Sequence, residues 1–73
     1  MHFSPREQEI LHLLAQYRSY AEIASILGIR RGTVSTYIER ISMKTDVYTQ
    51  VKLIQYAIEH GYGSAETAMK GDP

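Results

Sequence analysis

Apolar residues recur along the chain three and four positions apart, which is the spacing of helices that bury one face. In the first segment with this pattern, Ser4 and Glu7 form a capping box around Pro5, a residue favoured in the first turn of a helix. We therefore predict that a first helix begins at Pro5 and that Phe3 folds over its open end. The predicted core residues of this helix are Ile10, Leu13, Leu14 and Tyr17.

A second capping box, formed by Ser19 and Glu22, opens a shorter helical segment. Gly28 is placed to end it, because glycine readily takes the left-handed conformation found after helix C-termini. The sequence therefore predicts a second helix of about two turns before Gly28. Its apolar positions are Ile23, Ala24, Ile26 and Leu27.

A third helix is predicted for residues 31–45, ending near Asp46. Val34, Ile38 and Ile41 share the face that is expected to point inward. The opposite, mostly polar face holds Ser35, Thr36, Glu39, Arg40 and Met43.

A fourth helix is predicted between Thr49, which can cap its start, and Gly61, which is placed to end it. Its predicted core stripe is Val51, Ile54, Ala57 and Ile58. Together the four helices indicate an all-α domain over residues 1–62. A small, polar and flexible C-terminal tail is expected over residues 63–73.

Composition limits the kind of protein this can be. Seventy-three residues suffice for one domain with a thin core, since a chain of this size buries only about 60% of its unfolded surface. The absence of cysteine excludes disulfides and thiolate metal sites and suits a reducing cytoplasm. No apolar run approaches the roughly 18 residues of a membrane span, and no signal-peptide pattern is present. We therefore expect a cytoplasmic protein without a membrane partner.

Residues that could support chemistry are few and dispersed. His2, His12 and His60 lack the spacing and the neighbouring carboxylates of a metal site, so they are expected at the surface. The sequence has no nucleophile elbow and no glycine-rich phosphate loop, and a thin core leaves little room for a pocket. We therefore expect no metal, no cofactor and no enzymatic activity.

Charge is balanced in total but not in distribution. Eight Lys and Arg residues offset eight Asp and Glu residues. Residues 30–52 contain five of the basic residues and two of the acidic ones, so this segment carries +3 and the rest of the chain −3. Such segregation steers a polyanion toward one face of a domain even when the net charge is zero.

The junction of the second and third predicted helices has the spacing of a helix-turn-helix. Ala24 is small enough for two helices to cross closely, Gly28 can take the positive φ of a tight turn, and Val34 can anchor the next helix. Purely structural bundles also contain such helix pairs. The spacing alone therefore leaves both a DNA-binding and a structural role open.

A series of short segments follows in a recognisable order along residues 3–62: Ser4-Pro5-Arg6-Glu7, Glu9-Ile10-Leu11, Glu22-Ile23-Ala24, Leu27, Ile29, Gly32-Thr33-Val34, Arg40-Ile41, Lys44, Val47, Leu53-Ile54 and Ala57. In this order and without gaps, the chain resembles the LuxR-type (GerE/FixJ-type) helix-turn-helix domain of bacterial transcription regulators. The resemblance implies that the third helix lies in the major groove of DNA. It also implies that the fourth helix pairs two subunits on a two-fold-symmetric site.

Three positions depart from the pattern of that family. Arg30 stands where a Ser or Thr usually caps the third helix, Ser35 replaces a usual Lys, and Glu39 replaces a residue that is often basic or small. Glu39 would repel phosphate, but it could accept a hydrogen bond from cytosine N4 in the major groove. Either the target sequence is unusual or DNA binding has been weakened.

We expect two groups of DNA contacts on the third helix. The polar side chains suited to base edges are Ser35, Thr36 and Glu39. The flanking residues suited to phosphates are Arg31, Thr33, Tyr37, Arg40 and Lys44. The alternatives are that these exposed residues are merely solvated, that Arg40 only balances Glu39, and that Tyr37 caps the core with its ring.

Aromatic residues gather in the last third of the chain, at Tyr48, Tyr56 and Tyr62. More aromatic surface than a monomer needs is a sign of association, so we expect a homodimer contact through the fourth helix. Its expected residues are Leu53, Tyr56, Ala57 and His60. The alternative is that Tyr62 covers the end of the core and Tyr56 lies flat on an exposed helix.

Two functions from different classes remain. The first is sequence-specific binding of double-stranded DNA for transcription regulation, by a freestanding protein or by the output domain of a longer one. The second is a protein-interaction module with the same fold, which contacts another regulator or RNA polymerase. Ser35 and Glu39 favour the second, because a helix that has lost basic residues binds phosphate less well.

Overall fold

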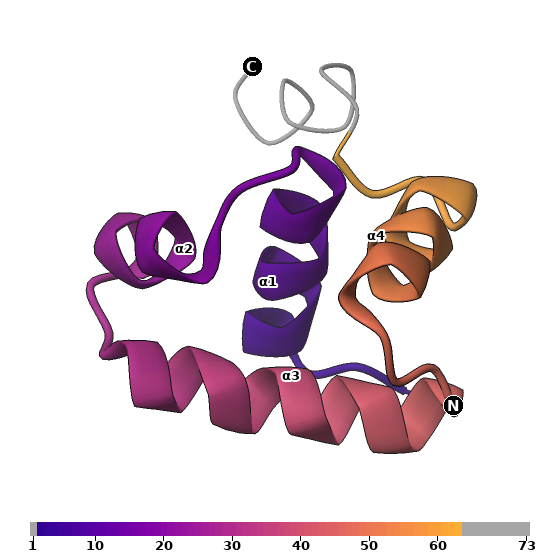
Figure 1. The fold of residues 1–73 in the computed structure, drawn as a ribbon, viewed down its shortest axis with the longest axis horizontal. Coiled ribbons are helices and arrows are strands. Elements are labelled where there is room, and N and C mark those ends of the chain that lie inside the picture. Colours follow the sequence, from indigo (N-terminus) through magenta and orange to yellow (C-terminus); the bar gives the residue numbers. More distant parts are fainter. Residues whose placement is uncertain (1, 64–73) are drawn as a thin grey trace.

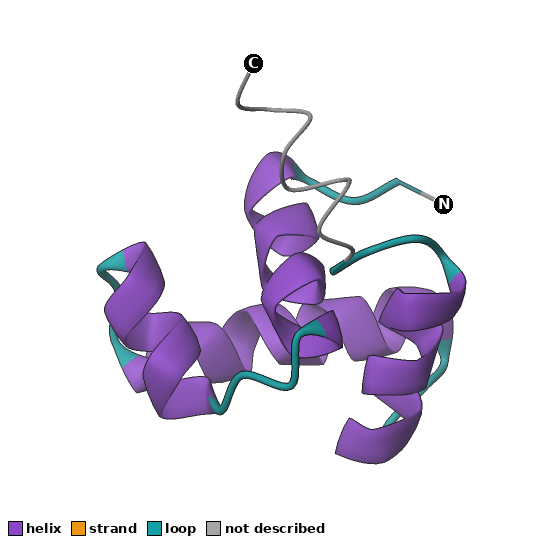
Figure 2. Ribbon diagram, turned by 90° about the horizontal axis from the view of Figure 1, so that it is seen from above, coloured by secondary structure: helices purple, strands orange, loops and turns teal. Residues whose placement is uncertain are grey.

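The computed structural model describes residues 2–63, which form four α-helices and, within that range, no strand. The helices are α1 (Pro5–Ala15), α2 (Tyr20–Leu27), α3 (Arg31–Thr45) and α4 (Gln50–Glu59). In Figure 1, α1 lies between α2 and α4, and α3 runs along the other side of all three. Figure 2 shows the same arrangement from above. The predicted all-α, four-helix fold is confirmed.

The predicted starts of α1, α2 and α4 are confirmed. Each of them depends on hydrogen bonds between residues three positions apart. The Ser4 hydroxyl accepts from the Glu7 amide at 3.2 Å, and the Ser4 amide donates to the Glu7 carboxylate at 2.7 Å. Ser19 and Glu22 form the same reciprocal pair at the start of α2. Thr49 accepts from the Lys52 amide at the start of α4.

The turn between α2 and α3 has the expected form. Gly28 adopts the left-handed conformation, with φ of 68°, and the Ile29 amide donates back to the Ala24 carbonyl. Arg30 precedes α3 and makes no side-chain capping hydrogen bond, so the amino end of this helix is the one start that is not capped by a side chain. The helix-turn-helix therefore consists of α2, this turn and α3.

The core is built around α1. This helix is buried on more than one side because it contacts each of the other three helices. The residues predicted to point inward from α3, namely Val34, Ile38 and Ile41, are buried as expected. The remaining buried apolar residues are Ile10, Leu11, Leu13, Leu14, Ala15, Ile23, Ala24, Leu53 and Ala57.

Tyr17, predicted as core, and Ile26, one of the apolar positions of the second helix, are both exposed. The helix α1 ends at Ala15, and Tyr17 then adopts a left-handed φ of 64°, which turns its side chain outward and leaves it 73% exposed. Ile26 is 52% exposed. It lies two residues after the buried Ala24, about 200° around the axis of α2, so it points away from the core. The core prediction for Tyr17 was therefore wrong because the helix ends two residues before it.

The face of α4 that enters the core also differs from the prediction. Val51 and Ile58, predicted as core, are 66% and 44% exposed, whereas Leu53, expected at a subunit contact, is 2% exposed. Ala57, predicted both in the core stripe and at the subunit contact, is 0% exposed, which confirms its place in the core. The helix carries apolar residues on two sides. The side that faces α1 is the one on which Tyr56 also meets the Phe3 ring, edge to face with centroids 6.3 Å apart.

The chain returns to α1 after α4. The Gly63 amide donates to Nδ1 of His12 at 3.0 Å, and a Cβ at Gly63 would collide with the side chain of Ala15. Gly63, assigned by the sequence to the tail, is therefore packed against α1, and His12 is half-buried rather than at the surface. The rest of the predicted tail lies outside the described residues.

The burial of Ala24, on the helix that contacts α3, generates a prediction. Ala24 is buried, so Ala24→Leu should overpack the crossing and destabilise the domain by about 1–3 kcal/mol. Ala21→Leu is the matched control, because Ala21 is exposed on the same helix and Leu forms helices nearly as well as Ala. Thermal unfolding followed by circular dichroism should show a lower Tm for the first variant alone. Equal melting temperatures would contradict a close crossing.

Candidate nucleic-acid interface

The side of α3 that faces away from the core is open. In Figure 1 no other described element covers it along the lower edge of the molecule. The residues exposed there include Gly32, Thr33, Ser35, Thr36, Glu39, Arg40 and Met43. A helix of 15 residues is about 22 Å long, so this open side forms a polar ridge that spans much of the domain.

The three residues expected at base edges all lie on this ridge and are exposed: Ser35, Thr36 and Glu39. The Thr36 hydroxyl donates to the Gly32 carbonyl at 3.1 Å, which leaves its oxygen free to act as an acceptor. Glu39 makes no ion pair within residues 2–63, where the pairs are Arg6 with Glu9 and Lys44 with Glu7. The charge balance between Arg40 and Glu39, considered as an alternative, is therefore not formed as a salt bridge.

Residues of different charge lie along opposite flanks of the ridge. Successive residues of a helix are turned by about 100° around its axis. Thr33, Tyr37 and Arg40 therefore fall on one flank, and Ser35 and Glu39 on the other. The acidic side chain is thereby separated from the basic flank of the same helix.

Tyr37 and Arg40 contact each other on the basic flank. The Tyr37 side chain is half-buried and packs against the core, while Arg40 is exposed. The guanidinium carbon of Arg40 lies 5.3 Å from the centroid of the Tyr37 ring, which is the geometry of a cation–π contact. Of the two roles left open for Tyr37, packing of its ring against the core is observed.

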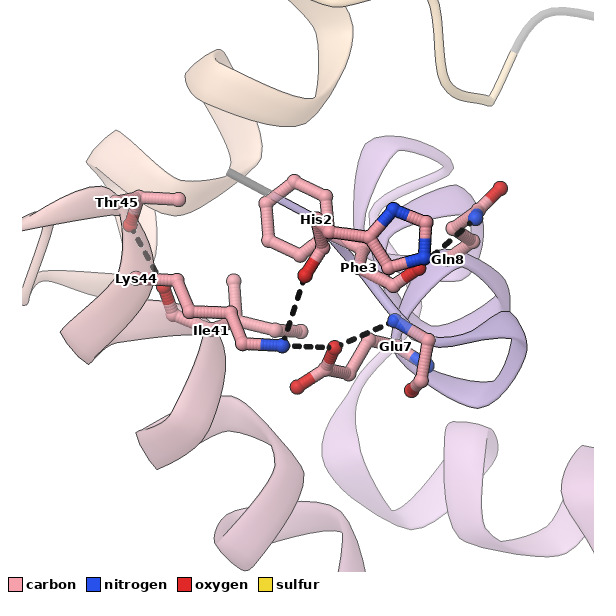
Figure 3. Close-up of polar contacts among 8 residues, drawn as sticks. His2, Phe3, Glu7, Gln8, Ile41, Lys44 and Thr45 are labelled. Atoms are coloured by element: carbon pink, nitrogen blue, oxygen red, sulfur yellow. Dashed lines mark hydrogen bonds and ion pairs between the residues drawn. The ribbon is translucent and has the colours of Figure 1, made fainter.

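Lys44 has a partner inside the domain. Its ammonium donates to the Glu7 carboxylate at 2.7 Å and to the His2 carbonyl at 2.9 Å, and it lies 5.8 Å from the Phe3 ring centroid. Figure 3 shows the ammonium between these two acceptors. Lys44, expected at a phosphate, thus ties the end of α3 to the start of α1. Sequence reasoning missed this pair, because no local pattern connects the two residues.

Opposing effects set the charge of Glu7. Burial raises the pKa of its carboxyl group, but hydrogen bonds from Lys44 and from the Ser4 amide, together with the positive charge of Lys44, outweigh burial and hold the pKa below its ordinary value. Glu7 is therefore ionised at neutral pH although it is almost fully buried. The pair is a charged link within the domain.

The amino end of α3 is basic. Arg30 and Arg31 are both exposed there, and no side chain caps the helix. The unpaired amides of a helix start carry a partial positive charge, which adds to that of the two arginines. This end of the ridge therefore attracts anions.

The solvent side of α4 carries apolar residues that sequence reasoning had placed in the core. Val51 and Ile58 are exposed on one side of the helix, with Gln55 between them at helical spacing. Of the residues expected at a subunit contact, His60 is exposed and Tyr56 is half-buried, with their rings stacked 3.9 Å apart. Leu53 and Ala57 belong to the core.

Two other kinds of site are not found in the described part of the chain. Within residues 2–63, no group of three or more His, Cys, Asp or Glu residues could hold a metal ion. None of the helices in this range has the length and apolar character needed to cross a membrane.

A domain whose second and third helices cross at a tight turn, and whose third helix exposes a polar and basic side, is of the helix-turn-helix class. A family model described as "Bacterial regulatory proteins, luxR family" (GerE) matches residues 1–57. The chain belongs to this family, which confirms the resemblance found in the sequence. The family is one of regulators and not of enzymes, and it supports DNA-binding transcription regulation as the class of function.

Curated relatives carry names of the same kind. The transcriptional regulatory protein MctR of Rhizobium johnstonii is 41% identical over 58 residues, which cover 80% of this chain and 27% of the relative. The transcriptional regulatory protein DesR of Bacillus subtilis is 39% identical over 78% of this chain and 29% of its own. The transcriptional activator protein CarR of Pectobacterium carotovorum is 41% identical over 77% of this chain and 23% of its own.

The chain thus spans about a quarter of the length of these curated relatives. No solved structure matches it significantly. The similarity therefore concerns the helix-turn-helix domain of the relatives and not their remaining length.

The ion pair between the buried Glu7 carboxylate and Lys44 predicts a pH-dependent stability. Because the pKa of Glu7 is lowered by folding, its stabilising effect is present above about 4.3, the usual pKa of Glu, and is lost as the pH falls through the lowered value. At neutral pH, Glu7→Gln should lower stability by about 1–3 kcal/mol, since it weakens a buried charged hydrogen bond. Urea unfolding should show that the difference in the free energy of unfolding between the unmodified protein and Glu7→Gln becomes smaller as the pH falls.

Glu9→Gln is the matched control for this test. Glu9 is exposed and, within residues 2–63, its one ion pair is with Arg6, one helical turn away, so its loss should change stability little at any pH. The comparison runs from neutral pH down to the lowest pH at which the unmodified protein is folded. If the loss of stability caused by Glu7→Gln stays constant over this pH range, the carboxylate does not stabilise the domain through its charge.

Proposed function

We propose that this chain binds double-stranded DNA in a sequence-specific manner, with α3 in the major groove, and thereby regulates transcription. The observation that carries the proposal is the open polar ridge of α3 in a domain of the luxR family. An α-helix with its side chains is about 10–12 Å across, and the major groove is about 12 Å wide. The names of the relatives, as transcriptional regulators and activators, support the same function.

The two flanks of the ridge suit two kinds of DNA contact. Ser35, Thr36 and Glu39 read base edges, where a hydroxyl can donate or accept and a carboxylate can accept from cytosine N4. Arg40 and Thr33 meet the phosphates of one strand on the other flank. Arg31 and the uncapped amino end of α3 meet a phosphate at the end of the ridge.

Two copies of the domain pair through α4 on a two-fold-symmetric site. The proposed contact uses the exposed side of the helix, Val51, Gln55 and Ile58, rather than the buried residues first expected there. Exposed apolar residues at this spacing gain from mutual burial. Two half-sites would then present two copies of α3 to successive major grooves.

A second candidate function is a protein-interaction module. It is favoured by the free carboxylate of Glu39, which lies on the ridge without an ion pair among the described residues and disfavours nearby phosphate. Another regulator or RNA polymerase would then contact the ridge in place of DNA. The two functions differ in their dependence on salt.

Salt titration separates them. We expect the affinity for a mixed-sequence DNA duplex to fall steeply as salt rises, with a slope that reports the number of phosphates contacted. Glu39→Ala should raise this non-specific affinity, because it removes a negative charge from the ridge. It should also relax the preference at one C·G base pair when preferred sites are selected from random DNA.

Glu9→Ala removes the same charge from α1, away from the ridge, and should leave both readouts unchanged. Absent or salt-independent binding of the unmodified protein would contradict the DNA-binding function and favour the protein-interaction module. Identical selected sites for the unmodified protein and Glu39→Ala would remove only the reading role of Glu39.

The pairing through α4 has its own test. Replacing both Val51 and Ile58 by Ser should abolish cooperative binding to a duplex with two half-sites while leaving binding to one half-site unchanged. Ile26→Ser is the matched control, since Ile26 is an exposed apolar residue on α2. Sedimentation of the protein–DNA complexes gives the stoichiometry. A double variant that still binds cooperatively would exclude this side of α4 as the contact.

A further inference from the structure

Tyr37 and Arg40 bring together an aromatic ring that packs against the core and an exposed guanidinium group. The two residues are three positions apart on α3, so they lie on the same flank one turn from each other. Packing against the core fixes the Tyr37 ring, and the Arg40 guanidinium carbon lies 5.3 Å from the ring centroid. The exposed arginine is thus in contact with a ring that is itself packed against the core.

A guanidinium over an aromatic ring keeps its hydrogen-bonding capacity. Its five N–H donors lie in the plane of the group, so a ring that contacts the face leaves the donors at the edge free. Arg40 forms neither a salt bridge nor a side-chain hydrogen bond within residues 2–63. The contact therefore restricts the long side chain without occupying its donors.

We propose that Tyr37 is a positioning residue, which holds the guanidinium of Arg40 on the basic flank of α3, ready to donate to a DNA phosphate. This inference rests on the proposed DNA-binding function. It changes the role first expected of Tyr37, because the aromatic ring acts through Arg40 and the hydroxyl is not the group that meets the phosphate. Holding the side chain in advance reduces the conformational entropy lost on binding.

The position of Glu39 gives this restraint a second effect. Glu39 follows the opposite flank, and a guanidinium held against Tyr37 stays on the flank away from that carboxylate. The acidic group is then left free for a base while the basic group is directed to the backbone. One helix can therefore carry both charges without their neutralising each other.

A double-mutant cycle with a short mixed-sequence DNA duplex tests the proposal. Exposed cation–π contacts correspond to about a two- to five-fold change in affinity, so Tyr37→Leu should weaken binding by about that factor. Tyr37→Phe keeps the ring and should bind as the unmodified protein does. In an Arg40→Ala background, Tyr37→Leu should cause no further loss. Arg40→Lys, which keeps the charge but not the planar group, should lose about as much as Tyr37→Leu.

Controls distinguish a positioning role of Tyr37 from a loss of folding stability and from an absence of DNA binding. Melting temperatures of all variants are measured, and binding is compared where each is folded. Tyr17→Leu, at an exposed tyrosine before α2, should bind normally. Additive losses in the cycle, or a loss with Tyr37→Phe equal to that with Tyr37→Leu, would overturn the positioning role. If the unmodified protein shows no salt-dependent binding, the proposed function itself has failed.

Discussion

The buried carboxylate of Glu7 is the constraint on which the arrangement of the domain depends. It accepts from the Ser4 amide, which fixes the start of α1, and from Lys44 near the end of α3. An ionised group this deeply buried must keep its partners, because leaving it unpaired costs several kcal/mol. The pair therefore sets which part of α3 lies against α1. With one side of α3 held there, its polar side must face outward.

The features of the fold that depend on local interactions were predicted correctly from the sequence. Capping boxes, the left-handed Gly28 and the inward side of α3 all follow from residues a few positions apart. Tyr17 was assigned wrongly because α1 ends at Ala15, before it reaches that residue. Val51, Leu53 and Ile58 of α4 were assigned wrongly because periodicity shows that a side of a helix is apolar and not which neighbour covers it. The contact of Lys44 with Glu7 could not be predicted from local sequence patterns either. The partner of Lys44 lies 37 residues away, and a lysine that is free to meet phosphate looks the same in sequence as one bound to a carboxylate of its own domain.

The candidate interface carries fewer free cations than its sequence suggested. With Lys44 bound to Glu7, the basic groups of α3 that form no salt bridge within residues 2–63 are Arg31 and Arg40, with Arg30 directly before the helix. Phosphate contacts supply most of the affinity of DNA-binding domains, so each remaining cation matters more. Preorganising one of them, and pairing two copies of the domain, are two ways in which a nearly neutral chain can reach useful affinity.

The two ends of the described chain leave the domain on different sides. The His2 carbonyl is bound to Lys44 at the end of α3, whereas Gly63 is bound to His12 of α1. The segment that follows α4, yellow in Figure 1, ends on the side of the molecule opposite α3. A fluorescent label or affinity tag joined before His2 would therefore start beside the ridge and crowd any duplex lying there. The same group attached through the Gly63 end would start behind the domain, where it leaves α3 accessible.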